Sequence, residues 1–205
     1  MVVDRPDPDI LKRAQEGDRD ALDVLLRPEV DRVYAVCRRM VSNRADAEEL
    51  AQDALVKIIH GLRGYDGRAS LSTWMTRVAI NVCLSWHRAR GRRMRRAGGI
   101  VGLEHPDSVE SPSAGEPGGV DGVQEREDPR RRRVERALDA VRPDFRAVLV
   151  LRDIRGLDYA AIGSALDLPV GTVKSRLFRA RAALREAMEA MEEDGGADGR
   201  GMVDE

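Results

Sequence analysis

The 205-residue sequence contains few aromatic residues and no long apolar segment. Aromatic residues make up 3% of the chain, and no stretch alternates strictly between apolar and polar residues, so a β-sandwich is disfavoured. No apolar run approaches the roughly 18 residues of a membrane span, and the acidic N-terminus is unlike a signal peptide. We therefore expect a cytoplasmic protein with no membrane partner.

Metal-ligating and redox-active residues are also scarce. The two cysteines, Cys37 and Cys83, occupy apolar positions of helical patterns, which predicts buried free thiols rather than a disulfide. The three histidines, His60, His87 and His105, share no ligand spacing with them. The sequence predicts no metal site and no cofactor.

Basic and acidic side chains nearly cancel over the whole chain, 35 against 36, but their distribution is uneven. Residues 61–97 contain nine basic residues and one acidic residue, and residues 130–190 contain 14 and eight. Residues 98–129, between them, contain one basic and eight acidic residues. Two cationic segments favour a polyanionic partner that is contacted at two places.

The spacing of apolar residues predicts an all-α protein, because they recur three and four positions apart wherever a core can form. We expect two small helical domains, residues 1–97 and residues 130–190. Residues 98–129 are rich in glycine and proline and have few large apolar residues, which predicts a flexible acidic linker. The glycine-rich acidic residues 191–205 are expected to be a disordered tail.

Within the first domain, a helix is expected from about Asp46 to His60, with Ile58 and Ile59 among its inward residues. The next ten residues contain three glycines and are predicted to form a loop. A long helix follows, for which either Ser70 or Ser72 can provide the N-cap.

Residues 158–190 have the pattern of a helix-turn-helix. Asp158 can cap a short helix, and the small residues Ala161 and Gly163 lie where a second helix must approach closely. The ninth position of the usual helix-turn-helix pattern is commonly glycine. This chain has Asp167 there. The second helix buries one stripe and leaves a basic face for the DNA major groove. The alternative is an αα-hairpin with a solvated basic face. The predicted inward stripe is Val173, Leu177, Ala180 and Leu184.

Three blocks of this sequence together resemble one protein family. Residues 168–181, LPVGTVKSRLFRAR, look like the promoter-reading helix of bacterial extracytoplasmic-function sigma factors of the sigma-70 family. Residues 46–53, DAEELAQD, are similar to the polymerase-binding helix of that family. Residues 72–81, STWMTRVAIN, followed by a basic run, resemble its element for melting and reading the minus-ten promoter sequence.

The resemblance implies a subunit without catalytic activity of its own. Such a protein binds core RNA polymerase, at the β′ clamp helices and the β flap, and recognises promoter DNA at the minus-ten and minus-thirty-five elements. The resemblance also implies an anti-sigma factor as a partner. One alternative is a stand-alone helix-turn-helix regulator. A recombinase or transposase is disfavoured, because the acidic residues cluster on one helix face and no strands are evident.

The resemblance assigns the acidic face of the 46–60 helix to polymerase. These side chains lie opposite Leu50, Ala54 and Ile58 and could pair with basic residues of a partner helix, although a merely solvated acidic face is the alternative. The predicted polymerase-binding residues are Asp46, Glu48, Glu49, Gln52 and Asp53.

Opening a duplex requires a pocket that captures an unstacked base, and a glycine-rich loop beside a helix can supply one. By resemblance Asn81 reads a base, and it lies off the apolar stripe of Val78 and Val82. Trp74 could stack on a base or belong to the core. Arginines of the basic run would bind phosphates. The predicted minus-ten residues are Tyr65, Asp66, Arg68, Ser70, Trp74, Arg77, Asn81, Arg88 and Arg92.

The second helix of the helix-turn-helix would read the minus-thirty-five element. By resemblance its base-contacting residues are Lys174, Ser175, Phe178 and Arg179, with Thr172 and Arg176 towards the DNA backbone. Thr172 lies near the helix start, where free amides favour phosphate.

The 32-residue linker can span the distance between the two promoter elements only when extended. A flexible chain of that length has a root-mean-square span of roughly 30 Å and can stretch to about 105 Å. Promoter elements about one and a half helical turns apart lie roughly 50 Å from each other. A polymerase surface could hold the linker extended, or the linker could be no more than a soluble tether.

Overall fold

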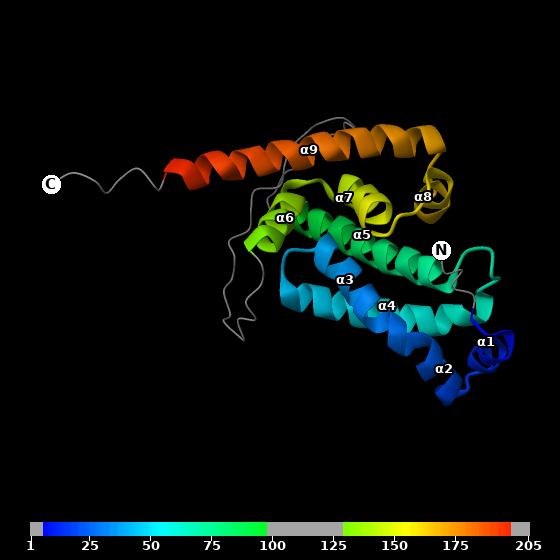
Figure 1. Ribbon diagram of the computed structural model, residues 1–205. Helices are drawn as coiled ribbons and strands as arrows, with labels where there is room; N and C mark the ends of the chain where they lie inside the picture. The colour runs from blue at the N-terminus through cyan, green and yellow to red at the C-terminus, as the bar shows by residue number, and fades with distance from the viewer. Residues whose placement is uncertain (1–5, 98–128, 198–205) are drawn as a thin grey trace.

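The computed structural model describes residues 6–97 and 129–197, and all regular structure within these ranges is helical, which confirms the predicted fold class (Figure 1). The predicted linker lies almost entirely outside the described residues. The N-terminal domain comprises α1 (Pro8–Gln15), α2 (Arg19–Leu26), the 3-10 turn η1 (Arg27–Glu29), α3 (Val30–Met40), α4 (Arg44–Gly61), the 3-10 turn η2 (Leu62–Gly64) and α5 (Leu71–Ala97). The C-terminal domain comprises α6 (Pro129–Ala140), α7 (Pro143–Leu149), the π-helical segment η3 (Val150–Ile154), α8 (Tyr159–Leu166) and α9 (Val170–Ala197).

Local sequence signals set the helix starts of the N-terminal domain. Asp7, Asp18 and Asn43 each accept hydrogen bonds from backbone amides of the first turn of α1, α2 and α4. Pro28 does not separate α2 from α3 by a loop, because it lies in η1, where a missing amide hydrogen is tolerated.

Helices α3, α4 and α5 pack against one another and form the core of the N-terminal domain. The buried stripe of α4 includes Ala47, Ala54 and Ile58. The prediction that Ile59 points inward is wrong, since it is 39% exposed. The physical reason is rotation: the core-facing stripe passes through Ile58 to Leu62, four residues later, and Ile59 lies about 100° away around the helix.

Ser70, rather than Ser72, caps α5. The hydroxyl of Ser70 accepts a hydrogen bond from the Thr73 amide at 3.1 Å and donates to the Thr73 hydroxyl at 2.8 Å. Ser72 is buried and its hydroxyl donates to Glu29, also buried, at 2.9 Å. The sequence allowed either serine as the N-cap. In the structure Ser70 caps α5, whereas Ser72 forms a hydrogen bond with a buried carboxylate.

The two helical domains pack directly on each other. Helix α3 contacts α6 and α7, and α5 contacts α7 and α8. In Figure 1, α9 lies on one side of the molecule and α4 on the opposite side, with α5 and α7 between them. Buried apolar residues of both domains belong to one continuous core.

The prediction of a disordered tail from residue 191 is wrong for residues 191–197, because α9 is helical through Ala197. Residues 198–205 lie outside the described part of the chain. Glycine and acid content suggested disorder, but the helix has partners on α6: Arg133 donates to the Met188 carbonyl oxygen at 3.3 Å and forms an ion pair with Glu192.

None of the helices within the described ranges is long and apolar enough to cross a membrane.

Candidate nucleic-acid interface

The helix-turn-helix consists of α8, a three-residue turn formed by residues 167–169, and α9. Asp158 caps α8 by accepting from the Ala161 amide at 2.7 Å. A Cβ added at Gly163 would lie 2.7 Å from the carbonyl oxygen of Leu168, so only glycine permits this close approach of the turn to α8. The Leu168 amide in turn donates to the Gly163 carbonyl oxygen at 2.9 Å. A close approach therefore occurs at Gly163, but the backbone that approaches it is that of the turn and not, as predicted, that of the second helix.

Asp167 follows α8 with φ 55° and ψ 52°, the left-handed conformation in which helices commonly end on glycine. It is the one residue other than glycine with positive φ among the described residues. Aspartate tolerates this region better than most side chains, which explains how the chain keeps the turn without the usual glycine.

Substitution of Asp167 should reveal the strain at this turn. We expect Asp167→Gly to leave the free energy of unfolding unchanged or to raise it slightly, and Asp167→Ala to lower it by about 1 kcal/mol, because alanine pays the full steric cost of positive φ. Urea denaturation of the three chains measures both changes. Equal stability of the alanine and glycine variants would show that the turn is not strained.

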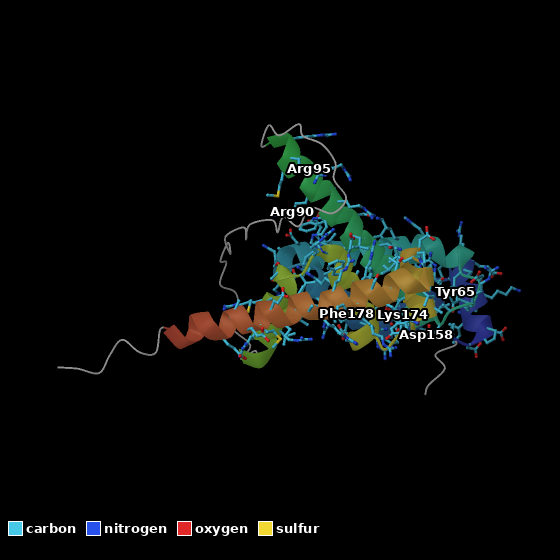
Figure 2. The ribbon with its side chains drawn as sticks, turned by 90° about the horizontal axis from the view of Figure 1, so that it is seen from above. Tyr65, Arg90, Arg95, Asp158, Lys174 and Phe178 are labelled. Carbon is cyan, nitrogen blue, oxygen red and sulfur yellow. The ribbon has the colours of Figure 1, made fainter. Side chains whose placement is uncertain are left out.

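The exposed side of α9 carries the residues predicted to read bases. Lys174, Ser175, Phe178 and Arg179 are exposed and form what we call the recognition face. Phe178 is 78% exposed, the highest exposure among the described large apolar residues. The opposite stripe is buried at Val173, Leu177 and Ala180, as predicted, with Leu184 partly buried against the core. Figure 2 labels Lys174 and Phe178 on α9.

Three cations of the C-terminal domain are held by neighbouring groups. The Lys174 ammonium lies 5.9 Å from the centre of the Tyr159 ring, and the Arg152 guanidinium lies 5.1 Å from the same ring. Arg181 pairs with Asp153 at 2.5 Å, and this hydrogen bond raises the pKa of Arg181. These contacts orient positive charge beside the recognition face.

Four of the residues predicted to bind minus-ten DNA form part of one exposed stripe along α5. Arg77, Asn81, Ser85, Arg88 and Arg92 are all exposed, at spacings of four, four, three and four residues, and we call this set the α5 stripe. The stripe spans about 22 Å of helix. The sequence interpretation did not name Ser85, although its position four residues after Asn81 places it on the same side of the helix. Its hydroxyl accepts a hydrogen bond from Arg88 at 3.1 Å. Figure 2 shows the last turns of α5, with Arg90 and Arg95, projecting beyond the rest of the molecule.

One of the loop residues predicted to bind minus-ten DNA, Tyr65, is buried. Tyr65 is only 7% exposed, and its hydroxyl donates to the Ala69 carbonyl oxygen at 2.6 Å. Its side chain therefore stabilises the loop and does not face solvent. Its ring lies 5.4 Å from that of Trp74, which is partly buried against the core, the second of the two roles considered for it. Asp66 and Arg68 are exposed and pair with each other at 3.0 Å.

The acidic side of α4 is largely accessible. Glu48, Glu49, Gln52 and Asp53 are exposed, whereas Asp46 is partly buried. Glu48 forms an ion pair with Arg44 at 3.0 Å. The predicted polymerase-binding residues thus share one side of α4, a helix that lies on the opposite side of the molecule from α9 (Figure 1).

Sequence reasoning missed a buried polar centre between the domains. Arg146 of α7 is 3% exposed and donates to the Met40 carbonyl oxygen at the end of α3, at 2.9 Å. It also donates to the Asp139 side chain and to the Asp139 and Val141 carbonyl oxygens. Burial lowers the pKa of Arg146, while Asp139 opposes that shift. The only signal in the sequence was an arginine on the apolar face of a short helix.

Two other titratable groups lie near this centre. His87 donates from Nε2 to the same Met40 carbonyl oxygen at 2.8 Å, and burial lowers the pKa of this histidine. Cys37 and Cys83 are buried free thiols, as predicted. A hydrogen bond to Cys37, together with burial, raises the pKa of the Cys83 thiol, which makes this thiol a poor nucleophile.

The fold and these surfaces define a helical DNA-binding protein with two domains, of which the C-terminal one is a helix-turn-helix. Comparison with known proteins identifies the family within this class of DNA-binding proteins. The family pattern described as Sigma-70 region 2 matches residues 25–93, and the pattern described as Sigma-70, region 4 matches residues 131–184.

Two curated relatives match over most of their length. The RNA polymerase sigma-H factor of Pseudomonas aeruginosa is 30% identical over 200 residues, which cover 93% of this chain and 98% of the relative. The ECF RNA polymerase sigma-E factor of Escherichia coli K12 is 29% identical over 180 residues, which cover 85% of this chain and 90% of the relative. The chain belongs to the sigma-70 family of RNA polymerase sigma factors, in its extracytoplasmic-function group.

A solved structure has the same fold. The sigma factor RpoE from Bartonella quintana, determined in complex with the anti-sigma factor NepR, aligns with a TM-score of 0.57 and 22% sequence identity. The alignment covers 80% of this chain and 94% of that chain.

Proposed function

We propose that this chain directs core RNA polymerase to promoters by a division of labour among three surfaces. The acidic side of α4 binds polymerase, the α5 stripe with its preceding loop captures the minus-ten element, and the recognition face of α9 reads the minus-thirty-five element. The observation that carries the proposal is the arrangement of these residues as three separate exposed surfaces on three helices.

Each surface has chemistry suited to its partner. Asn81 can form paired hydrogen bonds with an adenine edge, and Arg88 and Arg92 bind phosphates whatever the sequence. On α9, Lys174 and Arg179 can donate to guanine, and Phe178 offers an apolar contact to a thymine methyl group. Glu49 and Asp53 on α4 can pair with cations of a partner helix. We place the chain in the cytoplasm as a factor without catalytic activity of its own.

We further propose three protein contacts. The β′ clamp helices of core polymerase would receive the α4 surface, and the β flap would receive the C-terminal domain. An anti-sigma factor would compete for the same surfaces. The domain boundaries that we assign are residues 1–97 for the polymerase-binding and minus-ten domain and residues 130–190 for the minus-thirty-five domain.

The experiment that tests the proposed function is transcription in vitro from genomic templates with core RNA polymerase and this chain. Promoter-specific transcripts are expected only when both are present. A stand-alone regulator, the alternative function, would instead bind duplex promoter DNA tightly without polymerase. Absence of any promoter-specific transcript together with tight unaided binding would favour that alternative.

Two substitutions should separate the DNA-reading surfaces. We expect Asn81→Ala to reduce promoter opening roughly ten- to a hundredfold while polymerase binding persists, because one base contact is lost. Arg179→Ala should instead reduce transcription only from templates that depend on a minus-thirty-five element. Permanganate footprinting measures opening, and transcript yield measures promoter use.

The matched control for both substitutions is Arg19→Ala, at an exposed position of α2, a helix that carries none of the three surfaces. It should transcribe like the original chain. Loss of polymerase binding in Asn81→Ala would place Asn81 in the fold rather than in the DNA contact.

A further inference from the structure

Two cavities lie next to each other between α5 and the C-terminal domain. They adjoin because Leu84, Arg88 and Asp144 line both of them. The smaller cavity has a volume of about 230 Å³ and the larger one about 410 Å³. Cavities of several hundred Å³ are the usual size of sites for small organic ligands. The two cavities together therefore have room for one such ligand.

The larger cavity, which we call the arginine cavity, is strongly cationic. Its lining includes Arg88, Arg92 and Arg95 of α5, together with Arg142, which lies directly before α7. Asp144 is the one carboxylate among its described lining residues. A guanidinium group binds a phosphate through two parallel hydrogen bonds, so this set of side chains suits a ligand with several phosphate groups.

The arginines of this cavity are accessible and are not neutralised by neighbouring acids. Arg92, Arg95 and Arg142 are exposed, so a ligand can reach the cavity from solvent. Among the described residues, no carboxylate forms an ion pair with any of these three. The Arg142 guanidinium instead lies 5.2 Å from the centre of the Phe145 ring. Positive charges gathered without a counter-charge repel one another, and a bound anion removes that repulsion.

The smaller cavity, which we call the leucine cavity, adds apolar side chains to this site. It is lined by Leu84, Leu166 and Leu168, together with the partly buried Arg176 of α9. Apolar side chains and a planar guanidinium group are surfaces on which an aromatic base packs. Asp144 lines both cavities, and its carboxylate can accept hydrogen bonds from sugar hydroxyls. The leucines, the carboxylate and the arginines thus match the base, the ribose and the phosphates of a nucleotide.

We propose that the two cavities form a nucleotide-binding site, in which the base occupies the leucine cavity and two or three phosphate groups occupy the arginine cavity. An inorganic polyphosphate would use the arginine cavity alone, and a nucleoside would use the leucine cavity alone. A nucleotide contacts both cavities, so it should bind more tightly than either of its parts. The site belongs to the free chain and does not depend on the proposed roles in DNA and polymerase binding.

Isothermal titration calorimetry of the full-length chain tests the site without polymerase or DNA. The probes are ATP, GTP, adenosine and inorganic triphosphate, in a buffer without divalent cations so that the phosphates keep their charge. We expect ATP or GTP to bind at least about tenfold more tightly than adenosine and inorganic triphosphate, because each of these fills one cavity only. Equally tight binding of triphosphate would overturn the assignment to a nucleotide, and no binding of ATP and GTP would overturn the site.

Gly91→Leu tests whether the shape of the arginine cavity, and not charge alone, holds the phosphates. Gly91 lines this cavity, and a Cβ there would lie 3.5 Å from Nη1 of Arg95, the end of a flexible side chain. Helix α5 can therefore carry a larger residue at this position, and leucine would occupy the cavity without changing the net charge. We expect Gly91→Leu to weaken nucleotide binding about tenfold, the effect of losing one charge-assisted hydrogen bond. Arg142→Ala should have an effect of similar size.

Arg93→Ala is the matched control, because Arg93 is an exposed arginine of α5 that lines neither cavity. It removes the same charge as Arg142→Ala and should weaken nucleotide binding by less than about twofold. Circular dichroism verifies that each variant is folded, and Arg95→Ala, at an exposed position, replaces a variant that is not. Binding by Gly91→Leu at the original affinity, or equal losses in Arg93→Ala and Arg142→Ala, would overturn the proposal.

Discussion

Gly163→Ala should destabilise the helix-turn-helix and abolish transcription that depends on a minus-thirty-five element. The new methyl group would lie 2.7 Å from the Leu168 carbonyl oxygen, an atom of the turn backbone that cannot rotate away. Such overpacking costs about 1–3 kcal/mol, more than the helix propensity that alanine gains over glycine. The turn must shift, and α9 with it, so the recognition face loses its position relative to DNA.

Denaturant unfolding and transcription from paired templates, with and without a minus-thirty-five element, measure these two effects. Gly171→Ala is the matched control, because a Cβ at Gly171 of α9 meets nothing within 4 Å. It should leave stability unchanged or raise it by up to about 1 kcal/mol. A Gly163→Ala chain as stable and active as Gly171→Ala would show that the turn adapts without moving α9.

Arg146→Ala should produce the largest loss of stability among single substitutions of charged residues. The guanidinium donates to two carbonyl oxygens of its own domain, to the Asp139 carboxylate and to Met40 of the other domain. Removing it leaves buried acceptors without a donor and a cavity between the domains, which together lower the free energy of unfolding by about 3 kcal/mol.

Arg146→Lys should recover only part of that stability, because one ammonium group cannot reproduce the planar fork of donors. Arg136→Ala, at an exposed position of α6, should change stability by less than about 0.5 kcal/mol. Urea denaturation compares the three variants. If Arg146→Ala matched Arg136→Ala, the buried arginine would contribute no net stability to the fold.

Local patterns predicted most of the secondary structure and much of the exposed surface. Capping by Asp158 and the inward stripe through Val173 and Leu177 follow from rules that act within a few residues, and the structure agrees with them. The exposure of Asn81 also followed, because helical spacing alone sets it apart from Val78 and Val82. The DNA and polymerase roles of such residues stay predictions that the experiments above test.

Two residues have surroundings that differ from what the sequence suggested. Tyr65 was predicted to form part of a base-capturing pocket because it lies in a glycine-rich loop, but it is buried, its ring lies 5.4 Å from that of Trp74, and its hydroxyl donates to the Ala69 carbonyl oxygen. Ile59 was assigned to the core, although α4 turns it towards solvent. The composition of the loop did not reveal the burial of Tyr65, and the apolar pattern of α4 did not show that the buried stripe includes Ile58 but not Ile59.

The helical composition, the two cationic segments and the helix-turn-helix pattern are properties of the sequence by itself, because helix capping and periodicity are local. Tertiary structure alone decided that the domains pack together, through Arg146 on Met40 and Arg155 on Ser72. Those partners lie 106 and 83 residues apart in the chain. No local pattern encodes such a pair, since each contact depends on the packing of all the helices between its two residues.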